Sequence, residues 1–169
     1  MAKKDVSLRI ITDKLREIAN CHEMINGFEV GEEAVKGYSD DDEANEGKGN
    51  KELSYPYLWV DYDSTSYDIG EARSISSKTY SMRLFVADKQ SDNIKSDKDI
   101  MSDTEGILSD IVQWLLSKEE LRKIIVPNGR INATPTIDGT KDGAHGWSCT
   151  IPLKIPYVFC IENLPITPK

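Results

Sequence analysis

The sequence is poor in the residues that most often carry chemistry. It has only 2 histidines and 3 cysteines among 169 residues, and no CxxC, HxxxH or HExxH pattern. A zinc site needs three or four such ligands at compatible spacing, which His22 and His145 do not have around them. An odd number of cysteines without a CxxC pair predicts free, buried thiols in a reducing compartment. These cysteines are Cys21, Cys149 and Cys160.

Long apolar runs and an excess of basic charge are also missing. No stretch approaches the ~18 apolar residues that predict a membrane span. Asp5, Arg9 and Asp13 interrupt the N-terminus where a signal peptide would need an apolar core, so we expect a protein made and kept in a cytoplasm. The formal net charge of −8 argues against nucleic acid as the main partner, because duplex binding depends on neutralising phosphates. Local basic patches on a ring or channel stay possible.

The composition is that of one soluble globular domain over residues 1–169. A chain with 38% hydrophobic and 30% charged residues is large enough at this length to bury a single core. Residues 31–50 carry seven acidic residues against two lysines, so we expect residues 31–52 to form an exposed, flexible acidic loop. Residues 162–169 are interrupted by prolines and are expected to be an extended tail.

Two stretches have the apolar spacing of amphipathic helices. In residues 97–117 apolar residues recur at i, i+3, i+4 and i+7, and acidic residues occupy the first turns, where the helix dipole favours them. The second predicted helix runs from Val6 to Asn26, with Gly27 placed to end it. A capping-box pattern from Ser117 to Glu120 predicts one more short helix, which ends near Ile124.

Strand patterns precede the central helix. Phe28 and Val30 suggest a short strand, and residues 55–62 are aromatic and β-branched, as in a buried strand. Residues 77–88 alternate, with Tyr80, Met82, Leu84 and Val86 on one face. The segment between these two strands, residues 63–77, is expected to be a turn-rich excursion with at most a short strand around Ile69.

Two more strands follow the central helix. Residues 130–138 predict a strand that Pro135 restricts to an edge or a bulge. From Trp147 to Ile155 every second residue is apolar, which is the clearest strand alternation in the chain. The two are expected to form a hairpin with its tip at residues 139–144. The fold class we predict is α+β, an antiparallel-rich sheet packed by two long helices.

Patterns that resemble catalytic or metal sites have simpler structural explanations. The acidic run that begins at Asp40 could gather a hard cation, but calcium loops alternate their ligands and place a glycine at the sixth position. Cys149 and His145 could form a nucleophile pair, yet Cys149 falls on the apolar face of its strand, where a thiol is inert. We predict no catalytic, cofactor-binding or metal-binding residues.

Residues that could contact a partner are easier to identify. Trp114 lies off the main apolar stripe of the central helix, and tryptophan is enriched at interaction hot spots. Trp59, Trp114 and Trp147 could each be an interface anchor or an ordinary core residue, and Trp114 is the best interface candidate of the three. The other candidates are Asp40, Asp41 and Asp42 in the acidic loop and Gly139, Lys141, Asp142 and Gly143 at the predicted hairpin tip.

The order of these segments resembles that of a known family. The segments are YPYLWVDY (55–62), YSMRLFVAD (80–88), DIMSDTEGILSDIVQWL (99–115) and GWSCTIPLKIPYVFC (146–160) followed by ENLP. In order and spacing they are similar to the tail terminator proteins of tailed bacteriophages, and more broadly to neck and head–tail completion proteins. The resemblance covers roughly residues 53–165. It rests on structural residues and includes no catalytic pattern.

The resemblance implies a structural virion protein with no enzyme activity and no cofactor. Proteins of this family form homo-oligomeric rings, so the expected partners are further copies of the chain in a hexamer or dodecamer. The ring caps the head-proximal end of the tail tube, stops its growth and contacts the connector, while genomic DNA passes through the lumen. The expected location is the head–tail junction of the virion, after assembly in the host cytoplasm and without a membrane.

Two alternatives to the ring protein stay open. A non-catalytic binding module or assembly chaperone would be favoured by a stable monomer or dimer at all concentrations. A small enzyme would be favoured by a deep pocket that holds His145 together with an acidic partner.

Overall fold

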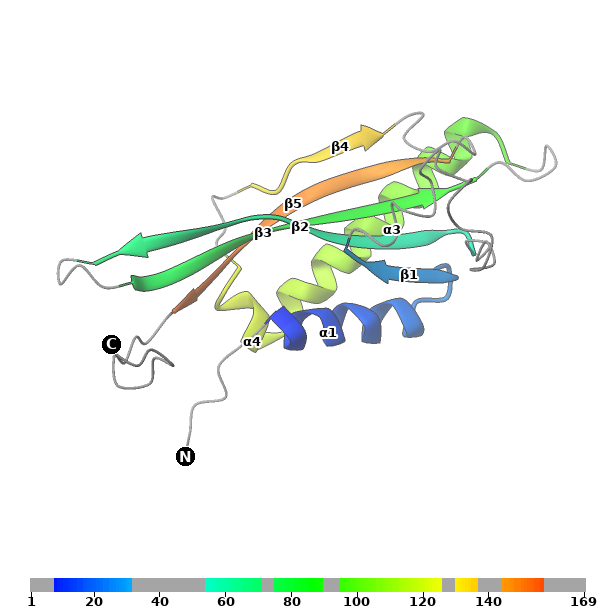
Figure 1. Cartoon of the computed structure of the whole chain (residues 1–169). Coiled ribbons are helices and arrows are strands. Elements are labelled where there is room, and N and C mark those ends of the chain that lie inside the picture. The colour runs from blue at the N-terminus through cyan, green and yellow to red at the C-terminus, as the bar shows by residue number, and fades with distance from the viewer. Residues whose placement is uncertain are drawn as a thin grey trace, which may run out of the picture.

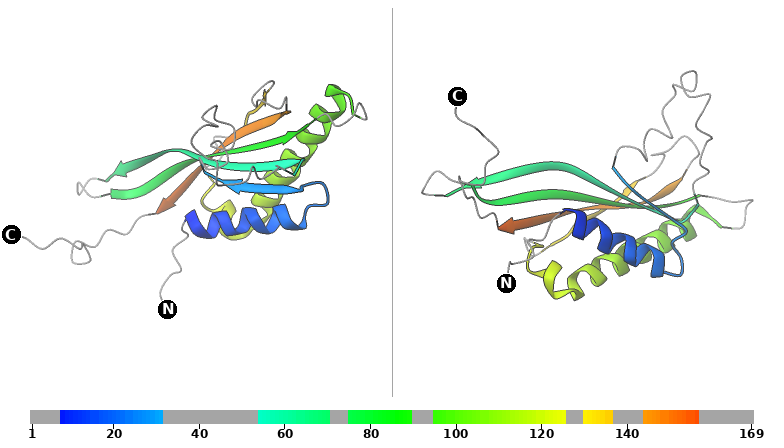
Figure 2. Two further views of the ribbon diagram at one scale, coloured as in Figure 1. Left: turned by 45° about the vertical axis from the view of Figure 1, so that its right-hand side comes forward. Right: turned by 60° about the horizontal axis from the view of Figure 1, so that its bottom comes forward.

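The computed structural model describes residues 8–31, 54–70, 75–89, 95–125, 130–136 and 144–156. In these ranges a five-stranded sheet of order β1-β2-β3-β5-β4 has the two long helices on one face (Figure 1 and Figure 2). The elements are α1 Leu8–Cys21, β1 Gly27–Val30, β2 Tyr57–Ile69, β3 Ile75–Asp88, α3 Asp97–Ser117, α4 Glu119–Arg122, β4 Ala133–Thr136 and β5 His145–Pro156. Neighbouring strands are antiparallel, except that β1 and β2 are parallel. The predicted α+β class is confirmed.

Helix α3 has the predicted bounds and a well-formed N-terminus. The Ser96 hydroxyl accepts a hydrogen bond from the Asp99 N–H, and the Asp99 carboxylate accepts one from the Ser96 N–H at 3.0 Å. This capping box satisfies the backbone N–H groups of Ser96 and Asp99. The hydrogen bond that the Ser96 hydroxyl donates to the Asp99 carboxylate at 2.6 Å, and then that from the Ser96 N–H, lower the pKa of the Asp99 carboxyl. The buried face packs on β3 and β5. It consists of Ile100, Thr104, Ile107, Leu108, Ile111 and Leu115.

Helix α1 is shorter than predicted, because residues 22–26 form a turn that leads into β1. The helix ends at Cys21, and Gly27 begins β1 rather than ending the helix. The N–H groups of Asn26 and Gly27 both donate to the Pro56 carbonyl, at 2.8 and 3.3 Å. A Cβ atom on Gly27 would lie 2.3 Å from the Tyr57 ring, so this close approach requires glycine.

The β2–β3 hairpin is the largest departure from the prediction. Residues 63–77 are mostly strand rather than a turn-rich excursion, because β2 continues to Ile69 and β3 begins at Ile75. The ladder runs from Ser64 opposite Ser81 to Ile69 opposite Ile75, after an irregularity next to Asp63. Figure 1 shows this part of the hairpin extending beyond the helices. We call residues 64–69 and 75–81 the distal hairpin.

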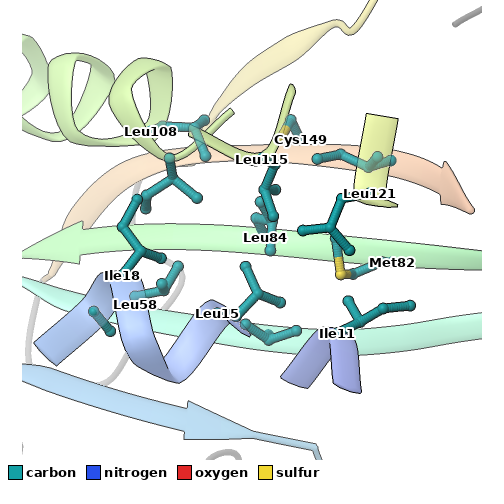
Figure 3. Packing of buried hydrophobic residues seen from close by; sticks show 14 of the residues in the cluster. Ile11, Leu15, Ile18, Leu58, Met82, Leu84, Leu108, Leu115, Leu121 and Cys149 are labelled. Atoms are coloured by element: carbon teal, nitrogen blue, oxygen red, sulfur yellow. The ribbon is translucent and has the colours of Figure 1, made fainter. Parts of the chain in front are cut away.

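The hydrophobic core lies between the sheet and the helices (Figure 3). Alternate residues of β2, β3 and β5 point into it, because successive side chains of a strand lie on opposite faces. The predicted facings of residues 80–86 and 147–155 are confirmed. The largest fully buried side chains are those of Ile11, Leu15, Leu58, Met82, Leu84, Ile100, Ile107, Ile111, Leu115, Leu121, Ile151 and Leu153.

The segment after α3 completes the far edge of the sheet. Strand β4 lies at this edge, as Pro135 predicts, and pairs with residues 146–149 of β5. Further along β5, the Lys154 N–H donates to the Ile124 carbonyl at 2.6 Å. The predicted capping box for α4 is wrong, because the N-cap residue is Lys118 and makes no side-chain cap. The Ser117 hydroxyl instead donates to the Trp114 carbonyl at 2.6 Å.

Candidate interaction surface

The second face of the sheet is the candidate functional surface. Figure 2 shows α1 and α3 on the same side of the sheet, so no helix of the described chain covers the opposite face. Side chains that alternate with the core residues point to this open face. Because Trp59 pairs with Phe85 and Asp61 with Arg83 across β2 and β3, aromatic and charged groups become neighbours there. On β3's other side, Ser148 of β5 lies opposite Phe85.

These residues line an open hollow of about 170 Å³ on this face. Its lining consists of Trp59, Asp61, Arg83, Phe85, Thr136 and Ser148. We call it the aromatic hollow. It draws on four strands of the sheet, since Thr136 belongs to the edge strand β4. Its shape therefore depends on the register of the whole sheet rather than on one loop.

The two aromatic rings of the hollow hold a fixed arrangement. The Trp59 indole Nε1–H donates to the Gly31 carbonyl at 3.2 Å, which satisfies the only polar group of that side chain. The Trp59 and Phe85 rings meet edge to face, with centroids 6.2 Å apart and planes at 77°. This is a favoured aromatic geometry. Both side chains remain partly exposed, so they present preformed apolar surface to solvent.

The charged residues of the hollow differ in how they are paired. Arg83 Nη2 lies 2.9 Å from Asp63 Oδ2, so this guanidinium already has an acidic partner. Asp61 Oδ1 accepts a hydrogen bond from the Tyr62 N–H at 2.8 Å. Within the described ranges, no lysine or arginine pairs with the Asp61 carboxylate. The hollow therefore combines apolar surface with one acidic group that has no basic partner there.

The distal hairpin presents a second surface on the same chain. In the described part of the chain, three large hydrophobic side chains are exposed, and two of them are here: Tyr67 at 53% and Ile69 at 73%. The Lys78 ammonium lies 5.6 Å from the centre of the Tyr67 ring, which is a cation–π distance. The hairpin end thus carries apolar side chains next to a positive charge.

A polar network ties the distal hairpin to β5. Lys154 Nζ lies 2.7 Å from Asp68 Oδ2, and the Ser77 hydroxyl donates to the same carboxylate. The hydrogen bond from Lys154 and then that from Ser77 lower the pKa of the Asp68 carboxyl. The Lys154 and Asp68 side chains are both solvent-exposed, so we expect the ion pair between them to contribute little to the stability of the fold. The network links β2, β3 and β5 at this end of the sheet.

Of the predicted interface residues only Trp114 lies within the described ranges, and it lines neither of these two surfaces. Trp114 is half-buried against the core, and the Lys118 ammonium lies 4.6 Å from the centre of its ring. Asp40, Asp41, Asp42, Gly139, Lys141, Asp142 and Gly143 lie outside the described residues. Sequence reasoning ranked Trp59 behind Trp114 and missed Phe85 and Tyr67. A signal for Trp59 was present in the sequence. Its neighbours Leu58 and Val60 are apolar core residues, and successive side chains of a strand point to opposite faces, so Trp59 must point to the open face.

The residues weighed for catalysis and metal binding are dispersed. His22 Nε2 lies 3.5 Å from Asp110 Oδ2 and connects α1 to α3. His145 begins β5 and does not line the hollow. Among the described residues, no three His, Cys, Asp or Glu side chains are placed to hold a metal ion. None of the helices described is long and apolar enough to cross a membrane.

The predicted burial of the cysteines is only partly correct. Cys149 is buried, and this burial raises the pKa of its thiol to about 11. Cys21 is exposed at the end of α1, contrary to the prediction. Ala19 is the last buried residue of α1, and Cys21 lies two residues after it, at the exposed end of the helix. Cys160 lies outside the described residues.

Comparison with known proteins adds no relative. The chain matches no protein-family model, and no curated protein sequence is significantly similar to it. The surfaces of the chain itself are therefore the observations that bear on function.

Proposed function

We propose that the chain is the subunit of a homo-oligomeric virion ring, a tail terminator or neck protein of a tailed bacteriophage. In this role the ring caps the tail tube and joins it to the head connector. The proposal includes the finer fold assignment, a tail-terminator-like arrangement of the α+β elements. It is supported by the resemblance of four segments in the order β2, β3, α3 and β5.

The observation that carries the proposal is the presence of two dissimilar exposed surfaces on one chain. A ring is built from heterologous contacts, in which one surface of a subunit binds a different surface of the next. The distal hairpin and the aromatic hollow are two such surfaces. A two-fold dimer would need only one self-complementary surface, so a chain with a projecting element and a separate hollow is better suited to a ring.

The charge of the chain is compatible with a DNA channel. A formal charge of −8 per subunit would be multiplied around a ring. An acidic lumen would repel the phosphate backbone, so that DNA passes without binding. A ring reconstruction that places mainly basic side chains on the lumen would contradict this part of the proposal.

The first test is the oligomeric state of the purified protein. Native mass spectrometry from micromolar to high concentration, with negative-stain images of the same sample, should reveal hexamers or dodecamers with a central hole. A compact dimer with one two-fold interface would contradict the ring and favour a binding module or chaperone.

The second test locates the ring in the virion and applies even if the ring closes only on its partners. In the virus that encodes the chain, loss of a tail terminator should leave tail tubes of excessive and irregular length. Loss of a neck ring should instead leave tails of normal length that are not joined to heads. Normal, joined virions in the absence of the chain would refute the proposed function.

A further inference from the structure

We infer that the distal hairpin of one copy docks in the aromatic hollow of the next copy. The inference rests on the proposed ring function and specifies which two surfaces meet. In this contact Tyr67 and Ile69 of one copy cover the Trp59 and Phe85 rings of its neighbour.

Geometry requires the contact to be between copies. Trp59 and Ile69 belong to the same strand, β2, and are ten residues apart. At a rise of about 3.3 Å per residue, a strand of this length separates them by roughly 30 Å. The hairpin therefore cannot fold back onto its own hollow. A contact between the two surfaces necessarily joins different copies and leaves one surface of each kind free to continue the assembly.

The apolar character of the two surfaces is the first argument for their docking. Exposed large hydrophobic side chains are concentrated at the hairpin end, where Tyr67 and Ile69 are 53% and 73% exposed. The hollow offers two aromatic rings, and their one polar group, the Trp59 Nε1–H, is already hydrogen-bonded, so covering them leaves no unpaired donor. Tyrosine and tryptophan dominate the energetic centres of protein interfaces. Docking would remove apolar surface from water on both sides.

Charge complementarity is the second argument. The hollow contains Asp61, whose carboxylate has no basic partner in the described part of the chain, whereas Arg83 beside it is paired with Asp63. The hairpin end carries Lys78 next to the Tyr67 ring. When Tyr67 enters the hollow, Lys78 accompanies it and brings a positive charge to Asp61. Opposite charges at this position would orient the hairpin and fix its register on the neighbour.

The distal hairpin would supply about half of a typical interface. Its two segments, residues 64–69 and 75–81, comprise thirteen residues, whereas standard interfaces involve about 20–30 residues on each side. One isolated contact is therefore expected to be weak. In a closed ring each contact is strengthened, because the other contacts of the ring keep the two surfaces close together and so raise their effective concentration.

The test uses one variant for each surface. In the hairpin variant Tyr67→Ser and Ile69→Ser remove the docking side chains, and in the hollow variant Thr136→Arg fills the hollow from its edge strand. Each variant alone should self-associate about 10- to 100-fold more weakly than the wild type. An equimolar mixture should form a 1:1 dimer, because the intact hairpin of the hollow variant fits the intact hollow of the hairpin variant. Sedimentation velocity and native mass spectrometry measure both results.

Two controls separate docking from misfolding. Met24 is the third exposed large hydrophobic, at 40% exposure, and lies on neither surface, so Met24→Ser should assemble like the wild type. A charge reversal, Asp61→Lys, should weaken assembly by roughly tenfold, and adding Lys78→Glu to the same chain should restore it. Restoration by a second substitution cannot result from a folding defect.

The outcomes distinguish this inference from the proposed function. Rings that persist in both variants overturn the docking while the ring function stands. A wild type that stays monomeric at millimolar concentration, together with no dimer in the mixture, also overturns the docking. The virion phenotypes described above then decide the proposed function separately.

Discussion

Replacing Gly146 by alanine should strongly destabilise the fold. Gly146 is buried in β5, opposite Ala87 of β3 and Thr136 of β4. A Cβ atom at this position would lie 1.8 Å from the Val86 carbonyl oxygen and 2.8 Å from the carbonyl carbon. Both are backbone atoms of a central strand and cannot rotate away. The substitution therefore forces β3 and β5 apart where Trp147 and Cys149 pack.

The expected magnitude follows from the nature of the obstructing atom. Overpacking a core usually costs about 1–3 kcal/mol, and a clash with backbone belongs at or above the upper end of that range. A loss of about 3 kcal/mol is a large fraction of the roughly 5–15 kcal/mol that stabilises a domain. For a chain of this length it corresponds to a melting temperature lower by roughly 6 to 12 °C.

Gly106 provides a matched control. It lies inside α3, and apart from its chain neighbours and the backbone of its own helix, no heavy atom of the described residues lies within 4 Å of the Cβ that alanine would add. Gly106→Ala should therefore stabilise the fold by up to about 1 kcal/mol, because glycine is a poor helix former. Urea unfolding followed by circular dichroism and tryptophan fluorescence measures both variants. A Gly146→Ala midpoint equal to or above that of the wild type would refute the close approach of β3 and β5.

Two further predictions concern buried charge and thiol reactivity. Lys95 Nζ lies 3.0 Å from both Asp88 and Asp103, and the Asp88 side chain is only 7% exposed, so Lys95→Met should cost about 1 to 3 kcal/mol in urea unfolding. The hydrogen bonds that Lys95 donates to Asp103 and Asp88 raise the pKa of the Lys95 ammonium above its ordinary value of 10.5. The stabilisation by Lys95 is therefore complete below pH 10.5 and is lost as the pH rises through the pKa of the folded state. An equal loss in Lys95→Met at pH 8 and pH 12 would contradict this. At pH 8, Cys21→Ser should remove a thiol that reacts rapidly with a disulfide reagent, whereas Cys149→Ser should leave the reactivity of the native protein unchanged, because the Cys149 pKa is about 11. Rapid labelling of Cys149 in the native state would show that it is not buried.

Periodic burial is what made α3, β3 and β5 predictable. In each of them one face meets the core along the whole element, so the apolar residues repeat at 3.6 or 2 positions. The bounds of α3 were predicted correctly for this reason, although its Ser96–Asp99 capping box was not recognised. The α+β class follows from the order of these elements alone.

The predictions were wrong for two segments in which the side chains do not follow the burial pattern of a regular element. The distal part of β2 from Asp63 to Ile69 is exposed throughout, so it lacks the alternation of buried and exposed side chains that marks β3 and β5. The C-terminal end of α1 was overextended because Ile25 continues the helical stripe and is indeed buried, but it is buried beyond the end of the helix. In both places the deciding interactions are backbone hydrogen bonds to residues distant in the chain.

The sequence by itself determined the class of fold, the face on which each buried residue lies and the scarcity of catalytic side chains. It also placed Phe85 opposite the core; the apolar neighbours Leu58 and Val60 imply the same facing for Trp59, which was not predicted. Only the tertiary structure decided that Trp59 and Phe85 are neighbours, that Asp61 lies beside them, and that Tyr67 projects at the far end of the same strand as Trp59. The physical reason is that side-chain facing is a local property with a fixed period, whereas strand register is set by pairing between distant segments.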